Sequence, residues 1–330
     1  MYRTILVWTA LLFAIKCAAI DINYSVSTIP DSLKANAKMV VRDYSQTLEI
    51  KSAGLAIETI SYVYTILNEN GYEYAQLSIP YSQKLNRVHS IRGAVYDAKG
   101  EKIENLTQDK VYDVSAISGF SLYEDHRKKI FTPKNRTFPF TVEYSYVFEY
   151  NGIIGLPEWW AMDEYNISVQ KSTFTMIAPQ TLSFRYREKS LPPNALFMKL
   201  EKGIETYRWE VKDRSAILEQ PYSGTFTDFT PVVLTAPNEI EIEGYRGKLE
   251  NWTDFGKWVA SLIEGRNLLP METQLLIREK TKNCKNDYEK AKVVYEYMQQ
   301  KTRYVNITIG IGGWQPIPAE TIDRLGYGDC

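Results

Sequence analysis

Alternation of apolar and polar residues over short segments is the feature that most constrains this chain, and it runs from about Ala37 to Val211. The segments VVRDYSQTLEI and AIETISYVYTIL alternate in this way and are rich in the β-branched and aromatic residues that strands favour. The segment FPFTVEYSYVFEY alternates from Phe140 to Tyr150, and the run from Asp97 to Gly100 joins two short strands as a hairpin turn. Many short strands without a helical period between them predict an antiparallel β-sandwich.

The period of the pattern changes after the stretch from Thr225 to Pro237. The next segments carry apolar residues at steps of three and four, which predicts amphipathic helices: these are WTDFGKWVASLIEG, LPMETQLLIREKT and NDYEKAKVVYEYMQQKTRY. In the third helix Asn286 can cap the first turn and Glu289 completes a capping box. One face of that helix carries Ala291, Val294, Tyr295 and Met298.

A strand, RYVNITIGI, a Gly-Gly-Trp-Gln-Pro loop and a short helix from Ala319 to Leu325 complete the helical half. The boundary between the halves is placed near residue 235. The predicted fold class is therefore α+β, with a β-sandwich domain over residues 20–235 and a helical domain over residues 236–330.

The N-terminus reads as a secretory signal peptide. Arg3 is followed by an almost wholly apolar run from Thr4 to Ile15, which is shorter than the ~20 residues of a membrane-spanning helix. Small residues at Cys17 and Ala19 indicate cleavage after Ala19, which leaves no membrane segment. The rival interpretation, a bacterial lipid anchor on Cys17, is opposed by Lys16, because lipoprotein signals have a small residue there.

Charge and side-chain inventory exclude several classes of function. The 39 lysines and arginines nearly cancel 40 aspartates and glutamates, whereas nucleic-acid binders carry a basic surplus. The two histidines, His89 and His126, lie far apart, so no metal site and no cofactor are predicted. Cys284 lies in a polar stretch between helices and is interpreted as an incidental thiol.

The last five residues, Gly326-Tyr327-Gly328-Asp329-Cys330, form a glycine-rich turn that leads to a thiol. A cysteine acts as thiolate, and the N-terminus of a following helix lowers its pKa. Glycines before the cysteine let the backbone turn tightly and bring amides close to a reacting carbonyl, whose oxyanion the cysteine's own N–H can help to hold.

The run YVNITIGIGGWQPIPAETIDRLGYGDC resembles the approach to the nucleophile in the transglutaminase-like superfamily, whose members share a papain-like thiol fold. The order and spacing from Asn286 to Cys330 match that family. The segments LNENG, VYDAKGEKI, YEDHR and LPEWWAMDEYNISVQKSTFTMIAP resemble the exported bacterial domain of unknown function that often precedes such a thiol domain. Together the resemblances cover nearly all of the chain after the signal peptide.

The resemblance implies acyl transfer, in which Cys330 attacks an amide carbonyl, a histidine moves the proton and an aspartate orients the histidine. The family places that histidine and aspartate after the cysteine, and His89 and His126 belong to the β half. We therefore expect this chain to be cut at the nucleophile, incomplete in its thiol domain and inactive by itself.

Four further residues are candidates for oxyanion or positioning roles: Trp314, Gln315, Gly328 and Asp329. Trp314 or Gln315 could supply a second oxyanion donor, although packing of the loop is the more economical role for Trp314. Asp329 is better placed to cap the following helix than to orient a base. Trp159-Trp160 could form a sugar or peptide platform, or a hydrophobic contact with the neighbouring domain.

Two functions remain in competition. The first is an exported thiol enzyme, periplasmic or extracellular, that transfers or hydrolyses acyl groups of peptide or protein amides. The second is a non-catalytic envelope interaction module beside a degenerate thiol domain. The residues leave the substrate, the choice between transfer and hydrolysis, and the oligomeric state open.

Overall fold

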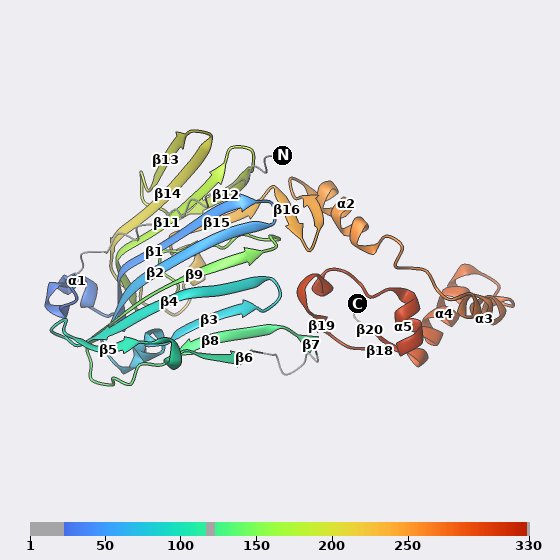
Figure 1. The fold of residues 1–330 in the computed structure, drawn as a ribbon, viewed down its shortest axis with the longest axis horizontal. Coiled ribbons are helices and arrows are strands. Elements are labelled where there is room, and N and C mark those ends of the chain that lie inside the picture. The colour runs from blue at the N-terminus through green and yellow to red at the C-terminus, as the bar shows by residue number, and fades with distance from the viewer. Residues whose placement is uncertain (1–22, 117–122, 329–330) are drawn as a thin grey trace, which may run out of the picture.

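A computed structural model describes residues 23–116 and 123–328. The predicted signal peptide and two predicted site residues, Asp329 and Cys330, lie outside the described residues. Strands dominate as far as residue 248 and helices follow (Figure 1), which confirms the β-rich prediction for the first half. No helix within the described ranges is both long enough and apolar enough to cross a membrane.

The largest element is an eight-stranded sheet with the order β13-β14-β11-β1-β2-β9-β4-β5 (Figure 1). Its strands are β1 (Met39–Ser52), β2 (Leu55–Ile66), β4 (Asn86–Tyr96), β5 (Lys102–Leu106), β9 (Phe140–Asn151), β11 (Ile167–Pro179), β13 (Leu196–Glu201) and β14 (Ile204–Arg214). The expected hairpin over Asp97–Gly100 joins β4 to β5.

One strand pair differs from the antiparallel prediction. β1 and β11 run parallel, with Met39 opposite Ile167, while the other neighbours in the sheet run antiparallel. Alternation indicates that a segment is a strand and which side chains share a face, but it carries no information about a partner more than 100 residues away. The direction of this pair therefore could not be derived from the local pattern.

Two three-stranded sheets cover one face of the large sheet. The first contains β3 (Leu77–Ser82), β6 (Tyr112–Ser115) and β8 (His126–Phe131); the second contains β10 (Trp159–Trp160), β12 (Phe184–Lys189) and β15 (Val232–Pro237). Short helical turns connect the strands: η1 (Val26–Thr28), η2 (Glu69–Ala75), η3 (Gln108–Lys110) and η4 (Phe226–Asp228). The boundary near residue 235 stays a prediction, and β15 runs across it.

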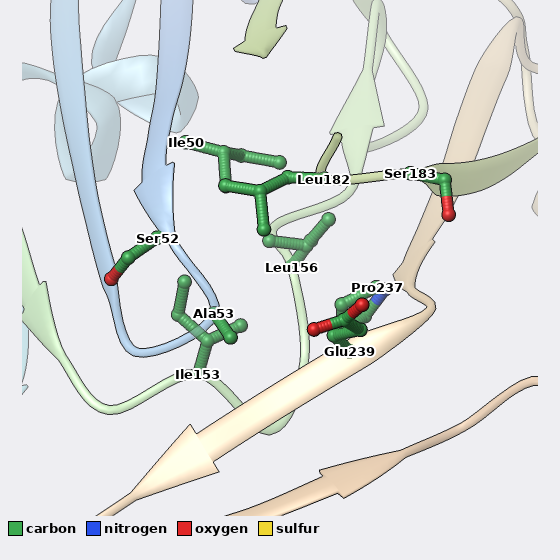
Figure 2. Close-up of a pocket in the computed structure, with 9 residues that line it drawn as sticks. All are labelled: Ile50, Ser52, Ala53, Ile153, Leu156, Leu182, Ser183, Pro237 and Glu239. Atoms are coloured by element: carbon green, nitrogen blue, oxygen red, sulfur yellow. The ribbon is translucent and has the colours of Figure 1, made fainter. Parts of the chain in front are cut away.

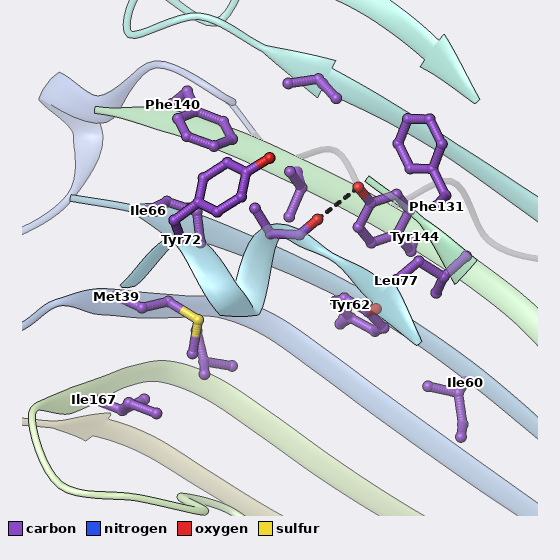
Figure 3. Packing of buried hydrophobic residues seen from close by; sticks show 14 of the residues in the cluster. Met39, Ile60, Tyr62, Ile66, Tyr72, Leu77, Phe131, Phe140, Tyr144 and Ile167 are labelled. Atoms are coloured by element: carbon purple, nitrogen blue, oxygen red, sulfur yellow. Dashed lines mark hydrogen bonds between the residues drawn. The ribbon is translucent and has the colours of Figure 1, made fainter. Parts of the chain in front are cut away.

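Each small sheet has its own apolar cluster beneath it. Under the first, Leu77 and Phe131 pack on Tyr62 and Tyr144, and the Tyr144 hydroxyl donates to the Ala75 carbonyl at 2.9 Å (Figure 3). Under the second, Trp159 and Val233 pack with other fully buried side chains, among them Leu48, Phe174 and Trp209. Leu48 lies opposite Glu58, which shares its face with Tyr62, so both clusters lie on the same face of the large sheet.

The opposite face of the large sheet is mostly polar, as the alternation predicts. Along β1 the buried Gln46, Leu48 and Ile50 alternate with the more exposed Ser45, Thr47 and Glu49. A short helix, α1 (Asp31–Lys34), covers one end of this face, where Leu33 packs against Val40.

A hairpin and a helix join the β half to the rest of the chain. The hairpin consists of β16 (Glu239–Ile242) and β17 (Tyr245–Lys248), and α2 (Trp252–Ile263) packs on it through Trp258 and Leu262. The Asn251 side chain caps α2 by accepting from the Asp254 amide at 3.0 Å. Where the hairpin meets β1, Figure 2 shows a small apolar cavity beside Ile50, Ile153 and Pro237. Its volume of about 10 Å³ leaves room for no more than one water molecule.

The other predicted helices also form: α3 (Met271–Thr281), α4 (Asp287–Lys301) and α5 (Ala319–Leu325). The Asn286 side chain accepts from the Glu289 amide at 2.9 Å, as predicted for the cap of α4. The Glu289 carboxylate accepts from the amide of Lys285, one residue before the position that a capping box requires.

The apolar face of α4 has no cover among the described residues. Val294 is 40% exposed, Tyr295 56% and Met298 49%. Figure 1 shows α3 and α4 at the end of the molecule farthest from the large sheet. The apolar pattern therefore predicted the helix and its apolar face, but that face is not buried among the described residues.

Candidate functional site

The chain reaches the predicted nucleophile through a glycine turn and a short strand. Gly326 ends α5 in the left-handed conformation, with φ 71°, and its amide donates to the Ile322 carbonyl at 2.8 Å. The chain then forms β20 (Tyr327–Gly328), which pairs in parallel with β18 (Arg303–Tyr304). The Gly328 carbonyl accepts from the Val305 amide at 2.9 Å, so the backbone is fixed up to the residue before Asp329.

Gly328 allows this strand to lie directly on α5. A Cβ atom at this position would lie 2.7 Å from Cδ1 of Ile322, which is closer than two carbon atoms approach without strain. The glycine is therefore required by packing, and any contribution of its amide to catalysis remains a prediction. The catalytic roles of Asp329 and Cys330 also stay predictions, because both residues lie outside the described residues.

The predicted strand from Arg303 to Ile311 is in fact two short strands with different partners. β18 pairs with β20, whereas β19 (Ile307–Thr308) pairs with β7 (Tyr123–Glu124) of the β half. A 3₁₀ turn, η5 (Gly310–Gly313), follows and contains the first two residues of the predicted Gly-Gly-Trp-Gln-Pro loop. The alternation of this segment could not reveal that the chain changes neighbours halfway.

A carboxylate at the centre of the helical half ties three helices together. Asp323 on α5 accepts from the Lys301 ammonium of α4 and, at 2.9 Å, from the Thr273 hydroxyl of α3. The hydrogen bond from Lys301 holds the pKa of Asp323 below its ordinary value, and the same bond raises the pKa of Lys301. This triad fixes α5, which in turn positions the glycine turn.

Trp314 and Gln315 lie on the other side of the helical half, against α2. The Trp314 ring meets the rings of Phe255 and Trp258 edge to face, with centroids 6.4 and 5.7 Å away, and is 46% exposed. The Gln315 amide donates to the Leu262 carbonyl at 3.2 Å. Hydrogen bonding to Gln315 and then to Arg266 lowers the pKa of Tyr245.

These contacts separate the sequence-predicted residues into two groups. Among the described residues, no hydrogen bond or ring contact joins Gly328 to Trp314 or Gln315. Trp314 packs the loop against α2, and the amide of Gln315 is engaged by the backbone of that helix. Whether either side chain faces Cys330 stays a prediction.

An ion pair between the β half and the β16–β17 hairpin holds the loop before α5. Glu243, in the turn of the β16–β17 hairpin, accepts from the Ile311 amide at 2.9 Å and pairs with Lys84 at 2.8 Å. Gly310 has φ 54°, and a Cβ there would lie 2.1 Å from the Glu243 carboxylate. No local pattern predicts these contacts of Glu243, because Lys84, Glu243 and Ile311 come from three distant segments.

The two histidines belong to the β half, and the internal cysteine belongs to the helical half. His89 on β4 and His126 on β8 are exposed in the β half, and Cys284 between α3 and α4 is a free thiol. Across residues 23–116 and 123–328, no three histidine, cysteine, aspartate or glutamate side chains gather closely enough to hold a metal ion.

The two adjacent tryptophans of the β half have different environments. Trp159 is fully buried, and its indole N–H donates to the Ser172 hydroxyl at 3.0 Å. Trp160 is half-buried and lines a pocket on the covered face of the large sheet. Only the second could therefore act as a platform.

Comparison with known proteins places the first half of the chain in a family. Residues 52–217 match DUF3857, described as a domain of unknown function with a solved structure. The chain belongs to the DUF3857 family. The match runs from the end of β1 through β14, so it covers most of the large sheet and the small sheet β3-β8-β6. No curated protein sequence matches the chain.

Among solved structures, a candidate protease from Parabacteroides distasonis has a TM-score of 0.61 and 13% sequence identity. The alignment covers 88% of this chain and 56% of that protein, so the chain spans about half the length of its structural relative. At this identity the likeness shows the fold alone. An aminopeptidase from Legionella pneumophila (TM-score 0.30, 12% identity, 62% and 22% covered) and a zinc metallopeptidase from Deinococcus radiodurans (0.31, 10%, 74% and 53%) are too dissimilar to carry an argument.

Proposed function

We propose that this DUF3857 protein is an exported, transglutaminase-like thiol enzyme that acts on amides of peptides or proteins, with Cys330 as the nucleophile. The observation that carries the proposal is the backbone before Asp329: α5, the left-handed Gly326 and the paired strand β20 form a rigid turn that leads to Gly-Asp-Cys. We propose that the helical half is the first part of a papain-like domain and that the β half is a sandwich domain beside it.

The fold likeness to the candidate protease supports a peptide or protein as substrate. It extends over both halves, because 88% of this chain is covered. The assignment of protease is that protein's own, and for this chain it indicates only the class of molecule to test first.

The proposed chemistry starts with the Cys330 thiolate. Its sulfur bonds to the amide carbonyl carbon, the carbonyl oxygen takes the negative charge, and the C–N bond then breaks as the leaving nitrogen gains a proton. The resulting thioester is released when an amine or water adds and the C–S bond breaks. A histidine must move the protons, and this chain offers only His89 and His126, both in the β half.

The test compares Cys330→Ala with Cys284→Ala in the protein expressed by its natural host. The substrate is a glutamine-containing peptide, and the readouts are ammonia release, incorporation of a primary amine and peptide-bond cleavage. We expect Cys330→Ala to lower the rate on the order of 10⁴- to 10⁶-fold, and Cys284→Ala to leave it unchanged. Turnover that survives Cys330→Ala would refute the nucleophile assignment.

Export is a separate part of the proposal and has its own test. Mass spectrometry of the exported protein should find a mature chain that starts near Ile20. A chain that begins at a lipid-modified Cys17 would instead support the anchored form.

The alternative function is a non-catalytic envelope interaction module with a degenerate thiol domain. The pocket beside Trp160 favours it, because it offers the β half a binding surface that needs no thiol. Absence of amide turnover in the natural protein, together with ligand binding by the β half, would favour this alternative.

A further inference from the structure

The pocket beside Trp160, on the covered face of the large sheet, has no part in the proposed acyl-transfer chemistry. It has a volume of about 190 Å³, smaller than the roughly 300–1,000 Å³ of pockets for drug-sized ligands. Its lining comes from β1, β2 and the segment around β10: Val41, Tyr44, Gln46, Tyr64, Glu158, Trp160, Ala161 and Asp163. The size suits one amino-acid side chain.

Aromatic rings form much of the wall. Tyr44 and Tyr64 flank the buried Tyr62, with ring centroids 6.5 and 4.4 Å from it, so their positions are fixed by packing. Trp160 completes the wall, and its indole N–H donates to the Glu158 carboxylate at 3.1 Å. The face of a tyrosine or tryptophan ring attracts a cation within about 6 Å of its centre.

The polar groups inside the pocket are already engaged with one another. Gln46, only 4% exposed, accepts from the Tyr44 hydroxyl at 3.1 Å and donates to the buried Glu58 at 2.7 Å. Glu58 also accepts from the Tyr150 hydroxyl at 2.7 Å. The side-chain amide of Gln46 is therefore not free to pair with a ligand.

The groups that stay available at the rim are mainly acceptors. Glu158 and Asp163 are exposed residues, and within the described part of the chain neither has a salt bridge. Although the residue as a whole is exposed, desolvation raises the pKa of the Asp163 carboxyl, so a cation beside it would favour its charged form. Lys38, which acts electrostatically on Asp163, pairs instead with Glu164 at 2.9 Å and Glu73 at 3.7 Å. A sugar needs donors as well as acceptors, whereas an ammonium or guanidinium group offers donors only.

We propose that this pocket binds the cationic side chain of a polypeptide, a lysine or an arginine, between Trp160, Tyr44 and Tyr64 with Glu158 and Asp163 as counter-charges. The proposal goes beyond the acyl-transfer function and does not depend on it, because no member of the pocket belongs to the helical half. A negative result for cation binding therefore does not contradict the acyl-transfer function, and a negative result for acyl transfer does not contradict cation binding.

The experiment is a titration of the full chain at low ionic strength, followed by ligand-observed NMR. The probe is acetyl-Gly-Lys-Gly-amide. The reference peptides carry norleucine or Nζ-acetyllysine at the same position, and a neutral N-acetylglucosamine disaccharide tests the sugar alternative.

We expect the lysine peptide to bind and the two neutral peptides to bind at least ten-fold more weakly. Trp160→Ala should weaken binding about 2- to 30-fold. Asp163→Asn, which removes the charge and keeps the shape of the side chain, should weaken it about five-fold. The matched controls are Trp252→Ala and Asp287→Asn, which alter exposed residues of the helical half and should change nothing.

Three outcomes would overturn the proposal: no binding of the lysine peptide at millimolar concentration, equal binding of the norleucine peptide, or binding of the disaccharide in place of the peptide. If Trp160→Ala fails to fold, the affinity for the lysine peptide is measured with Trp160→Phe and Asp163→Asn instead. Lysine-peptide affinity that neither variant changes would place any binding outside this pocket.

Discussion

The contact between α2 and the β16–β17 hairpin rests on a single glycine. A Cβ added at Gly247 would lie 2.4, 2.7 and 2.8 Å from three atoms of Trp258. Trp258 is only 2% exposed, so it has little room to move. Carbon atoms in contact prefer about 3.5–4.0 Å, so the indole would have to withdraw by about 1 Å. Forcing a methyl group into a packed site of this kind costs about 1–3 kcal/mol.

Gly256 provides the matched control within the same unit. It lies in the middle of α2, is exposed, and a Cβ there meets nothing within 4 Å. Alanine is favoured over glycine in a helix interior by about 0.5–1 kcal/mol. Gly247→Ala should therefore lower the free energy of unfolding and Gly256→Ala should raise it, although both make the same chemical change.

Urea unfolding followed by tryptophan fluorescence measures the difference, because Trp258 and Trp314 lie at this contact. We expect the midpoint for Gly247→Ala to fall and that for Gly256→Ala to rise, with the slope against urea unchanged. Equal midpoints for Gly247→Ala and the parent chain would refute the packing of α2 on the hairpin.

Further predictions concern two carboxylates. Burial raises the pKa of Glu58, so the free energy of unfolding should fall as pH rises from the unfolded-state value near 4.3 through the folded-state pKa. Glu58→Gln should flatten that dependence in a pH series of urea midpoints, and an unaltered slope would contradict the assignment. Asp323, whose pKa Lys301 lowers, should have the opposite effect: its stabilisation is present above about pH 3.9 and is lost as pH falls through the folded-state pKa. Asp323→Asn should speed hydrogen exchange in α5 at neutral pH, whereas Asp287→Asn, at a fully exposed carboxylate, should not.

Local pattern was sufficient for the elements of this fold. The helix from Ala319 to Leu325 has the predicted ends, and Asn286 caps α4 as predicted. The residues that define each helix end lie within a few positions of that end, so the local sequence contains the information. The direction of β1 against β11 and the change of partners after Tyr304 depend on segments far apart in the chain, so no local period encodes them.

The sequence indicates Trp160 as a candidate platform, but the other pocket residues were missed for a similar reason, although one signal of buried polar contacts was present. Glu58 occupies an inward position in the alternation that also places Ile60 and Tyr62 on the covered face. A glutamate at such a position requires buried partners, which Gln46 and Tyr150 supply. That the aromatic wall also includes Trp160, about 100 residues later, follows only from the three-dimensional fold.

The most direct test of the proposed function is to detect the acyl-enzyme itself. The protein from its natural host is mixed with a glutamine-containing peptide, quenched in acid, digested and analysed by mass spectrometry. We predict a thioester-linked peptide on Cys330, formed with loss of ammonia or of a peptide amine, and its absence in Cys330→Ala. A parent protein that turns the peptide over while Cys330 stays unmodified, or a Cys330→Ala variant that turns it over at the parent rate, would contradict the account.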